Sequence, residues 1–93
     1  MVKEKLVPVY DYHKSYYGKA VVLKQDNGDL WLKSYNTVVI KIVNGQPVRI
    51  WTDYSDTTMR HVREFMRQFY YADYNYPKKW WNELPIDIYG EEE

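Results

Sequence analysis

The first half of the chain alternates hydrophobic and polar residues in short runs rich in β-branched side chains, which is typical of β-strands. The four runs are residues 18–24, 30–35, 37–43 and 47–52. Asn27-Gly28 and Asn44-Gly45 stand between neighbouring runs, and Asn-Gly is a strong signal for a tight hairpin turn. The pattern therefore predicts an antiparallel β-meander over residues 18–52.

The N-terminal segment, residues 1–17, carries one more candidate strand around Pro8. Proline has no backbone N–H to donate to a neighbouring strand, so this strand would lie at an edge of the sheet. The meander would then have four or five strands.

After residue 54 the hydrophobic period changes from two residues to three and four, which indicates an amphipathic helix. The apolar positions are Met59, Val62, Phe65, Met66 and Phe69. The candidates for the helix N-cap, with side-chain oxygens that accept backbone N–H groups, are Ser55, Asp56 and Thr57. Pro77 disfavours helix at the residues before it, so we predict a helix over residues 55–74.

An aromatic and acidic tail follows over residues 75–93, with one more helical turn expected at 78–84. A chain of 93 residues is one small domain. The fold class is therefore α+β over residues 1–93. An antiparallel meander of four to five strands is packed by one amphipathic helix, and an aromatic-rich C-terminal tail follows.

Side chains alternate between the two faces of a strand, which divides the predicted sheet into two sets of residues. The apolar set, expected to receive the helix, is Leu30, Leu32, Val38, Ile40, Ile42, Val48 and Ile50. The opposite set mixes aromatic rings with cations and is the candidate binding face. Its residues are Trp31, Lys33, Tyr35, Lys41, Arg49 and Trp51.

Three kinds of partner suit such a face. The chain's own tail or a second copy would cover it, since Trp80 and Trp81 are large apolar residues and the tail is acidic. A different protein would use the aromatic residues as anchors. Single-stranded nucleic acid would stack its bases on them.

Net charge weakens the nucleic-acid reading, because 13 basic side chains are balanced by 13 acidic ones. The charges are unevenly spread: residues 1–52 carry 8 basic and 4 acidic side chains, and residues 53–93 carry 5 basic and 9 acidic ones. There is no cysteine, which excludes disulfides and thiolate metal sites. No apolar run approaches the length of a membrane span, so a cytoplasmic protein is expected.

Candidates for catalysis are few. His61 and Glu64 lie three residues apart on one helix face, but a metal site needs more ligands than one such pair, so we predict no metal and no cofactor. No nucleophile elbow or phosphate-binding loop is present, and the chain is predicted not to be an enzyme. Three arginines at helical spacing form a basic stripe suited to phosphate or an acidic partner: Arg60, Arg63 and Arg67.

Two segments, SYNTVV (34–39) and YSDTTMRHVREF (54–65), carry a resemblance. They resemble small uncharacterised phage and mobile-element proteins of Gram-positive bacteria, which pair an SYxTxV strand with a YSxTTxRHxxEF helix start. The matching positions are Tyr35, Thr37, Tyr54, Ser55, Thr57, Thr58, Arg60, His61 and Phe65. The resemblance implies a phage-type accessory protein in the cytoplasm of a bacterial host, and it carries no activity with it.

We therefore expect a protein that acts by binding. The favoured reading is a phage-type accessory protein that binds a host or phage protein, with inhibition of a host defence nuclease as one form of that function. One alternative is a single-stranded nucleic-acid-binding protein that uses the aromatic and basic sheet face. The other is a homo-oligomeric structural protein. No membrane and no small-molecule cofactor are expected.

Overall fold

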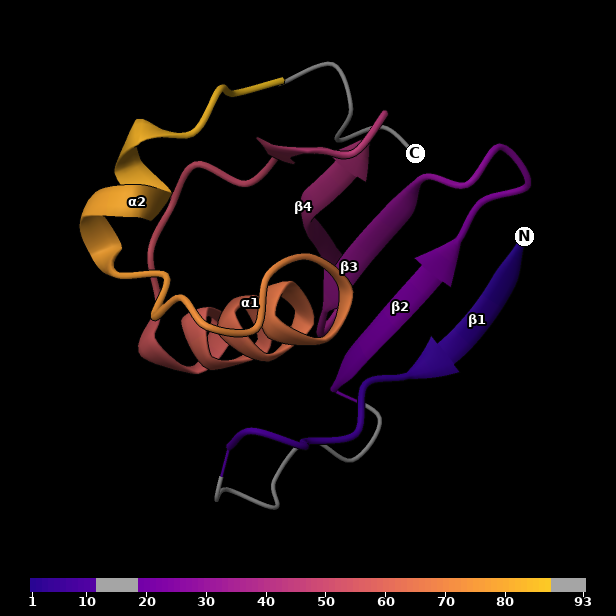
Figure 1. Cartoon of the computed structure of the whole chain (residues 1–93), viewed down its shortest axis with the longest axis horizontal. Helices are drawn as coiled ribbons and strands as arrows, with labels where there is room; N and C mark the ends of the chain where they lie inside the picture. Colours follow the sequence, from indigo (N-terminus) through magenta and orange to yellow (C-terminus); the bar gives the residue numbers. More distant parts are fainter. Residues whose placement is uncertain (12–18, 88–93) are drawn as a thin grey trace.

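The chain forms a five-stranded antiparallel sheet with two helices packed on one side of it (Figure 1). This computed structural model describes residues 1–11 and 19–87. Its elements are β1 (Val2–Lys5), β2 (Ala20–Lys24), β3 (Leu30–Ser34), β4 (Thr37–Val43), β5 (Gln46–Arg49), α1 (Asp56–Phe69) and α2 (Lys78–Glu83). Each strand pairs with the next in the chain, so the α+β class and the antiparallel meander are confirmed.

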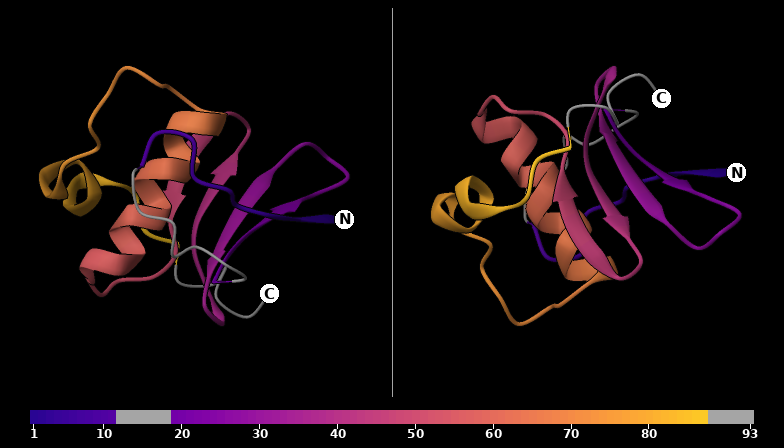
Figure 2. Two further views of the ribbon diagram at one scale, coloured as in Figure 1. Left: turned by 90° about the horizontal axis from the view of Figure 1, so that it is seen from below. Right: turned by 90° about the horizontal axis from the view of Figure 1, so that it is seen from above.

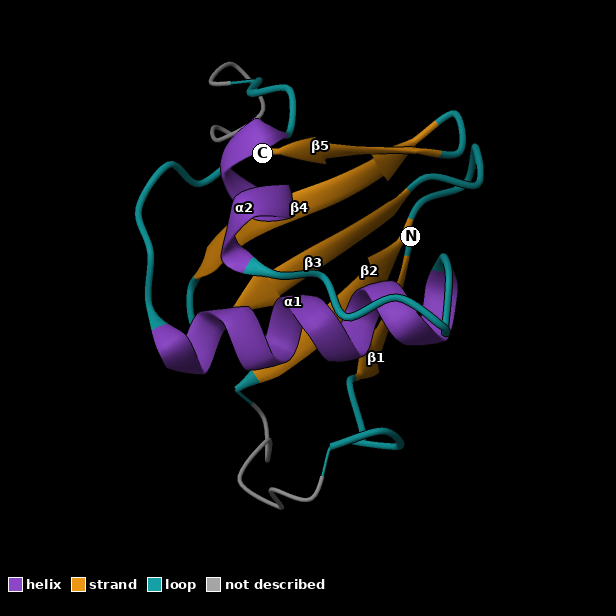
Figure 3. Cartoon of the chain, turned by 60° about the vertical axis from the view of Figure 1, so that its left-hand side comes forward, coloured by secondary structure: helices purple, strands orange, loops and turns teal. Residues whose placement is uncertain are grey.

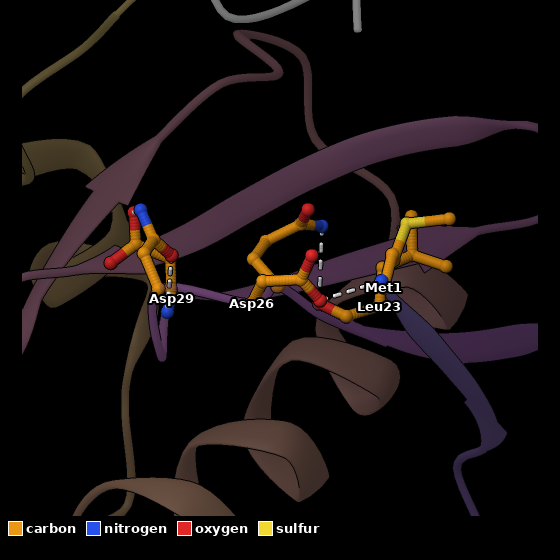
Figure 4. A network of polar contacts seen from close by, with 6 residues as sticks. Met1, Leu23, Asp26 and Asp29 are labelled. Carbon is orange, nitrogen blue, oxygen red and sulfur yellow. Dashed lines mark hydrogen bonds and ion pairs between the residues drawn. The ribbon is translucent and has the colours of Figure 1, made fainter.

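The two Asn-Gly turns form where the sequence predicts them. Asn44 and Gly45 both adopt a left-handed backbone, with φ of 52° and 77°, as the tight turn between β4 and β5 requires. Gly28 has φ of 94° in the turn between β2 and β3. Beside that turn, Asp26 forms an ion pair with the Met1 ammonium group, whose nitrogen lies 2.8 Å from Oδ1 of Asp26 (Figure 4).

β1 lies earlier in the chain than predicted. It begins at Val2 and pairs with β2, and Leu6 adds one more hydrogen bond from its N–H to the carbonyl oxygen of Ala20. Pro8 lies beyond the strand, because the chain there leaves the sheet edge and turns toward α1. All four β1 residues are exposed.

The face assigned to β5 was wrong by one residue. The tight turn pairs Val43 with Gln46, and this register places Pro47 opposite Ile42 and Arg49 opposite Ile40. Arg49 therefore lies on the helix side of the sheet, and Val48 lies on the other side. A shift of one residue exchanges the two faces of a strand, and here turn geometry outweighed the hydrophobic pattern.

A β-bulge corrects a second expectation. Leu32 pairs with Ile40 but Lys33 pairs with Val38, so Val39 is an extra residue in β4. Val39 joins the buried core, whereas Val38 is opposite Lys33 on the side away from the helices.

α1 begins where predicted and ends earlier. Ser55 is the N-cap, since its side-chain oxygen accepts the N–H of Thr58 at 3.3 Å. The helix ends at Phe69 instead of residue 74, with the N–H groups of Tyr70 and Tyr71 both donating to the carbonyl oxygen of Met66. The buried Tyr76 stabilises this end, because its hydroxyl group donates to the carbonyl oxygen of Tyr71 at 2.6 Å.

The helices cover one face of the sheet only (Figure 2). α1 runs across the strands, and α2 lies beside it on the same side (Figure 3). Trp81 of α2 is fully buried in the core with residues of α1 and the sheet. The extra helical turn predicted after Pro77 is therefore confirmed as α2.

The tail was one of the candidates to cover the aromatic face. Its described residues instead reach the end of β5, and residues 88–93, which include the acidic end of the tail, lie outside the described residues. The N–H of Arg49 donates to the carbonyl oxygen of Pro85, and the N–H of Asp87 donates to the carbonyl oxygen of Arg49. This segment shields the β5 edge from pairing with other chains. None of the helices in the described ranges is long and apolar enough to cross a membrane.

Candidate functional site

The outer face, which we define as the side of the sheet away from α1 and α2, consists of two cross-strand rows. The first row crosses all five strands and contains Lys3, Leu23, Trp31, Lys41 and Val48. The second row contains Lys5, Val21, Lys33 and Val38. Four of these nine residues are lysines and none is acidic. The strands therefore place an apolar centre between positive charges.

Trp31 is held in place by Lys41. The Lys41 ammonium nitrogen lies 3.7 Å from the centre of the Trp31 ring, and Lys41 is only 6% exposed. A desolvated cation–π contact of this kind contributes up to about 2 kcal/mol. One side of the indole is consequently occupied by a cation.

A cavity of about 370 Å³ opens on this face over β1, β2 and β3. It is lined by Met1, Lys3, Val21, Leu23, Trp31, Lys33, Tyr35 and Asn36. Tyr35 sits at its margin in the β3–β4 turn, half exposed and with a left-handed φ of 55°. Four of the six predicted face residues, Trp31, Lys33, Tyr35 and Lys41, therefore lie on the outer face or at its margin.

The other two predicted residues belong to the interior. Arg49 is 6% exposed and lies against Trp81, with its guanidinium carbon 4.5 Å from the ring centre. Its nitrogens donate to the carbonyl oxygens of Trp51 at 2.9 Å and Thr52 at 2.7 Å. Burial lowers the pKa of Arg49. Trp51 packs against the core, so both residues stabilise the fold and do not form part of the outer face.

Two arginines of the α1 stripe donate hydrogen bonds to residues 74–76, in the segment between α1 and α2. The Nε atom of Arg63 donates to the carbonyl oxygen of Tyr76 at 2.9 Å, and that of Arg67 donates to the carbonyl oxygen of Tyr74 at 3.2 Å. Arg67 also donates from Nη2 to Oδ1 of Asn75 at 3.1 Å. Arg60 is exposed. The stripe has a structural role that the helical spacing alone did not indicate.

These arginines line a second cavity, of about 270 Å³. Its lining residues are Tyr10, Asp11, Arg60, Arg63, Glu64, Arg67 and Asn75. It lies on the α1 side of the molecule, because four of its lining residues belong to α1, whereas the first cavity is lined mainly by residues of β1, β2 and β3.

Glu64, which the sequence indicated only as a possible partner of His61, has a structural role in this region. Its carboxylate is 2% exposed and accepts the backbone N–H groups of Val9, Tyr10 and Asp11 at 3.0 Å each. Gln68 donates a further bond of 2.6 Å. The side chain therefore fastens the N-terminal segment to α1.

A buried hydroxyl–imidazole pair was also missed. Ser34 and His61 are 27 residues apart in sequence, yet Ser34 Oγ lies 2.7 Å from His61 Nδ1. Burial, with the positive charge of Lys19, lowers the pKa of His61, and Asp11 opposes this in part. Both residues are 3% exposed or less, so the pair lies inside the fold. Across residues 1–11 and 19–87, no group of three His, Cys, Asp or Glu side chains could hold a metal ion.

Residues 4–83 of the chain match a protein family described as a family of unknown function, DUF8033. The chain belongs to this family. The matched range extends from within β1 to the end of α2, so the DUF8033 region includes the Trp31–Lys41 contact and the arginines of α1. No curated protein and no solved structure matches the chain.

Proposed function

We propose that the protein is a binding protein whose outer face takes an acidic segment of another protein. The two cross-strand rows carry this proposal, because they place the partly exposed Trp31 among Lys3, Lys5 and Lys33 and contain no acidic residue. Interfaces of this kind use a buried aromatic anchor for affinity and peripheral charges for steering and specificity. An apolar side chain flanked by carboxylates matches this arrangement.

The charge pattern also bears on the other partners. Two copies that met through the outer face would bring lysine rows together, which disfavours self-association there. A host or phage protein, predicted from the resemblance to phage-type proteins, is a suitable partner where its surface is acidic. If that protein is a defence nuclease, the outer face would contact a surface away from its basic substrate cleft, since like charges repel.

Single-stranded nucleic acid remains the second candidate, because Lys3, Lys5 and Lys33 attract phosphate groups. The Trp31–Lys41 contact places it second. A stacking base would compete with the Lys41 ammonium for one side of the indole.

The test immobilises three forms of the chain and exposes each to a lysate of the bacterial host. The forms are wild type, a Trp31→Ala/Lys33→Glu double variant and a Lys79→Glu control. Lys79 is exposed on α2, away from the outer face. We expect wild type and control to retain the same protein and the double variant to lose it. Equal retention by all three forms would contradict the proposal.

A salt series with a single-stranded oligonucleotide separates the two candidates. We expect no tight binding at low salt. Tight binding that weakens steeply with salt and is lost in Trp31→Ala would favour nucleic acid instead.

A further inference from the structure

The arginine cavity on the α1 side is a binding site of a different kind. Its lining includes side chains that the fold holds in position through some of their donor nitrogens, while other donor nitrogens of the same side chains have no acceptor among the described residues. Arg63 and Arg67 each donate a hydrogen bond from Nε to a backbone carbonyl oxygen, which restricts the orientation of their guanidinium groups. A fixed guanidinium group loses less conformational entropy when it binds a ligand.

Several donors in this cavity have no acceptor among the described residues. They are the two terminal nitrogens of Arg63, Nη1 of Arg67 and Nδ2 of Asn75. The carboxylate of Glu64, although it lies in the cavity wall, already accepts four N–H donors and is 2% exposed. The donors that remain therefore suit an anion with several oxygens.

Arginine pairs with phosphate through two parallel hydrogen bonds, a geometry that lysine does not offer. The volume of about 270 Å³ lies just below that of common ligand sites, which measure about 300–1,000 Å³, and it suits a small ligand. Tyr10 is half exposed at the cavity wall, with the guanidinium carbon of Arg67 5.8 Å from its ring centre, and it offers the rest of its aromatic surface beside the arginines.

We propose that this cavity binds the phosphoryl group of a small phosphate monoester. The phosphate contacts Arg63, Arg67 and Asn75, and the organic part of the ester lies against Tyr10. This site goes beyond the proposed protein-binding function, since it uses other residues on the opposite side of the sheet.

The experiment follows backbone and side-chain NMR signals of the full chain during titration at low ionic strength. The probes are inorganic phosphate, a nucleoside 5′-monophosphate and the matching nucleoside without phosphate. We expect saturable shifts at Arg63, Arg67 and Asn75 with both phosphates and none with the nucleoside. Tighter binding of the monophosphate, reduced in Tyr10→Ala to that of free phosphate, assigns the organic part to Tyr10. Equal binding of the two phosphates would overturn the assignment of a monoester, because the organic part would then make no contact.

Asn75→Asp is the decisive variant. It keeps the oxygen that accepts from Arg67 but replaces the Nδ2 donor with a negative charge, so the fold is retained while phosphate is repelled. Loss of one hydrogen bond to a charged group corresponds to about 10- to 100-fold in affinity. Asn82→Asp, at an exposed position of α2, is the matched control and should bind as wild type does. Absence of shifts with both phosphates, or equal affinities of the two variants, would overturn the proposal.

Discussion

Glu64→Gln tests the attachment of the N-terminal segment to α1. The substitution is isosteric, and it converts one carboxylate oxygen to an NH₂ group. In the structure Oε2 accepts from the N–H of Val9 at 3.0 Å and from Nε2 of Gln68 at 2.6 Å, and it shares the N–H of Tyr10, at 3.2 Å, with Oε1. If the NH₂ group takes this position, two donors face a third donor.

The magnitude follows from these two bonds. A hydrogen bond to a charged group contributes about 1.5–3 kcal/mol, and part of the loss is recovered as the freed groups contact water. The remaining oxygen, which accepts from Tyr10 and Asp11, also loses its charge. We expect the free energy of unfolding to fall by about 2–4 kcal/mol. For a domain of this size the melting temperature should drop by roughly 10–25 °C.

Thermal unfolding followed by circular dichroism measures the drop, and hydrogen exchange locates its cause. The amides of Val9, Tyr10 and Asp11 should exchange much faster in the variant than in wild type. Glu83→Gln is the matched control, because Glu83 is exposed on α2 and should change neither quantity. A Glu64→Gln protein that melts with wild type and keeps these three amides protected would refute the reasoning.

Two further predictions concern α1. Ser55→Ala removes the N-cap and should lower the free energy of unfolding, measured by urea denaturation, by about 0.5–2 kcal/mol. Thr57→Ala, at an exposed position outside the cap, should leave that free energy nearly unchanged. The reverse order would show that the cap is misassigned. Burial lowers the pKa of His61, so its contribution to the free energy of unfolding is fully present above the unfolded-state pKa of about 6.5. This contribution is lost as pH falls below that value, because the unfolded chain then binds a proton that the folded chain resists. His61→Gln should flatten this dependence between pH 7.5 and 5, and an unchanged slope would assign it to other groups.

The local chemistry of the sequence was sufficient to predict the antiparallel meander and the residue at which α1 begins. Asn44-Gly45 forms its tight turn because few other residue pairs tolerate two successive left-handed positions. Ser55 caps α1 because its side chain lies within reach of an N–H that has no partner inside the helix. Both features depend on neighbours three residues away or fewer, so a single sequence contains them.

The tertiary structure decided which residues share a face and a cavity. Arg49 was assigned to the outer face because its neighbours Val48 and Ile50 are apolar, but the register from the β4–β5 turn put it beneath Trp81. α1 ends at Phe69, and Tyr76, a few residues farther along, donates from its hydroxyl group to the carbonyl oxygen of Tyr71 just beyond the helix. Neither outcome follows from the hydrophobic period, since the first depends on turn geometry and on Trp81, 32 residues away, and the second on a residue beyond the helix.

The same holds for the polar groups. Four of the six predicted outer-face residues could be found from strand alternation, which reports the side of a strand reliably where the register is kept. The buried Glu64 carboxylate could not be found this way, since its backbone donors come from more than 50 residues earlier in the chain. Sequence determined the elements and their polarity. Packing alone determined which of these charges are used inside the fold and which face solvent, because burial and hydrogen bonding between distant segments are properties of the folded chain.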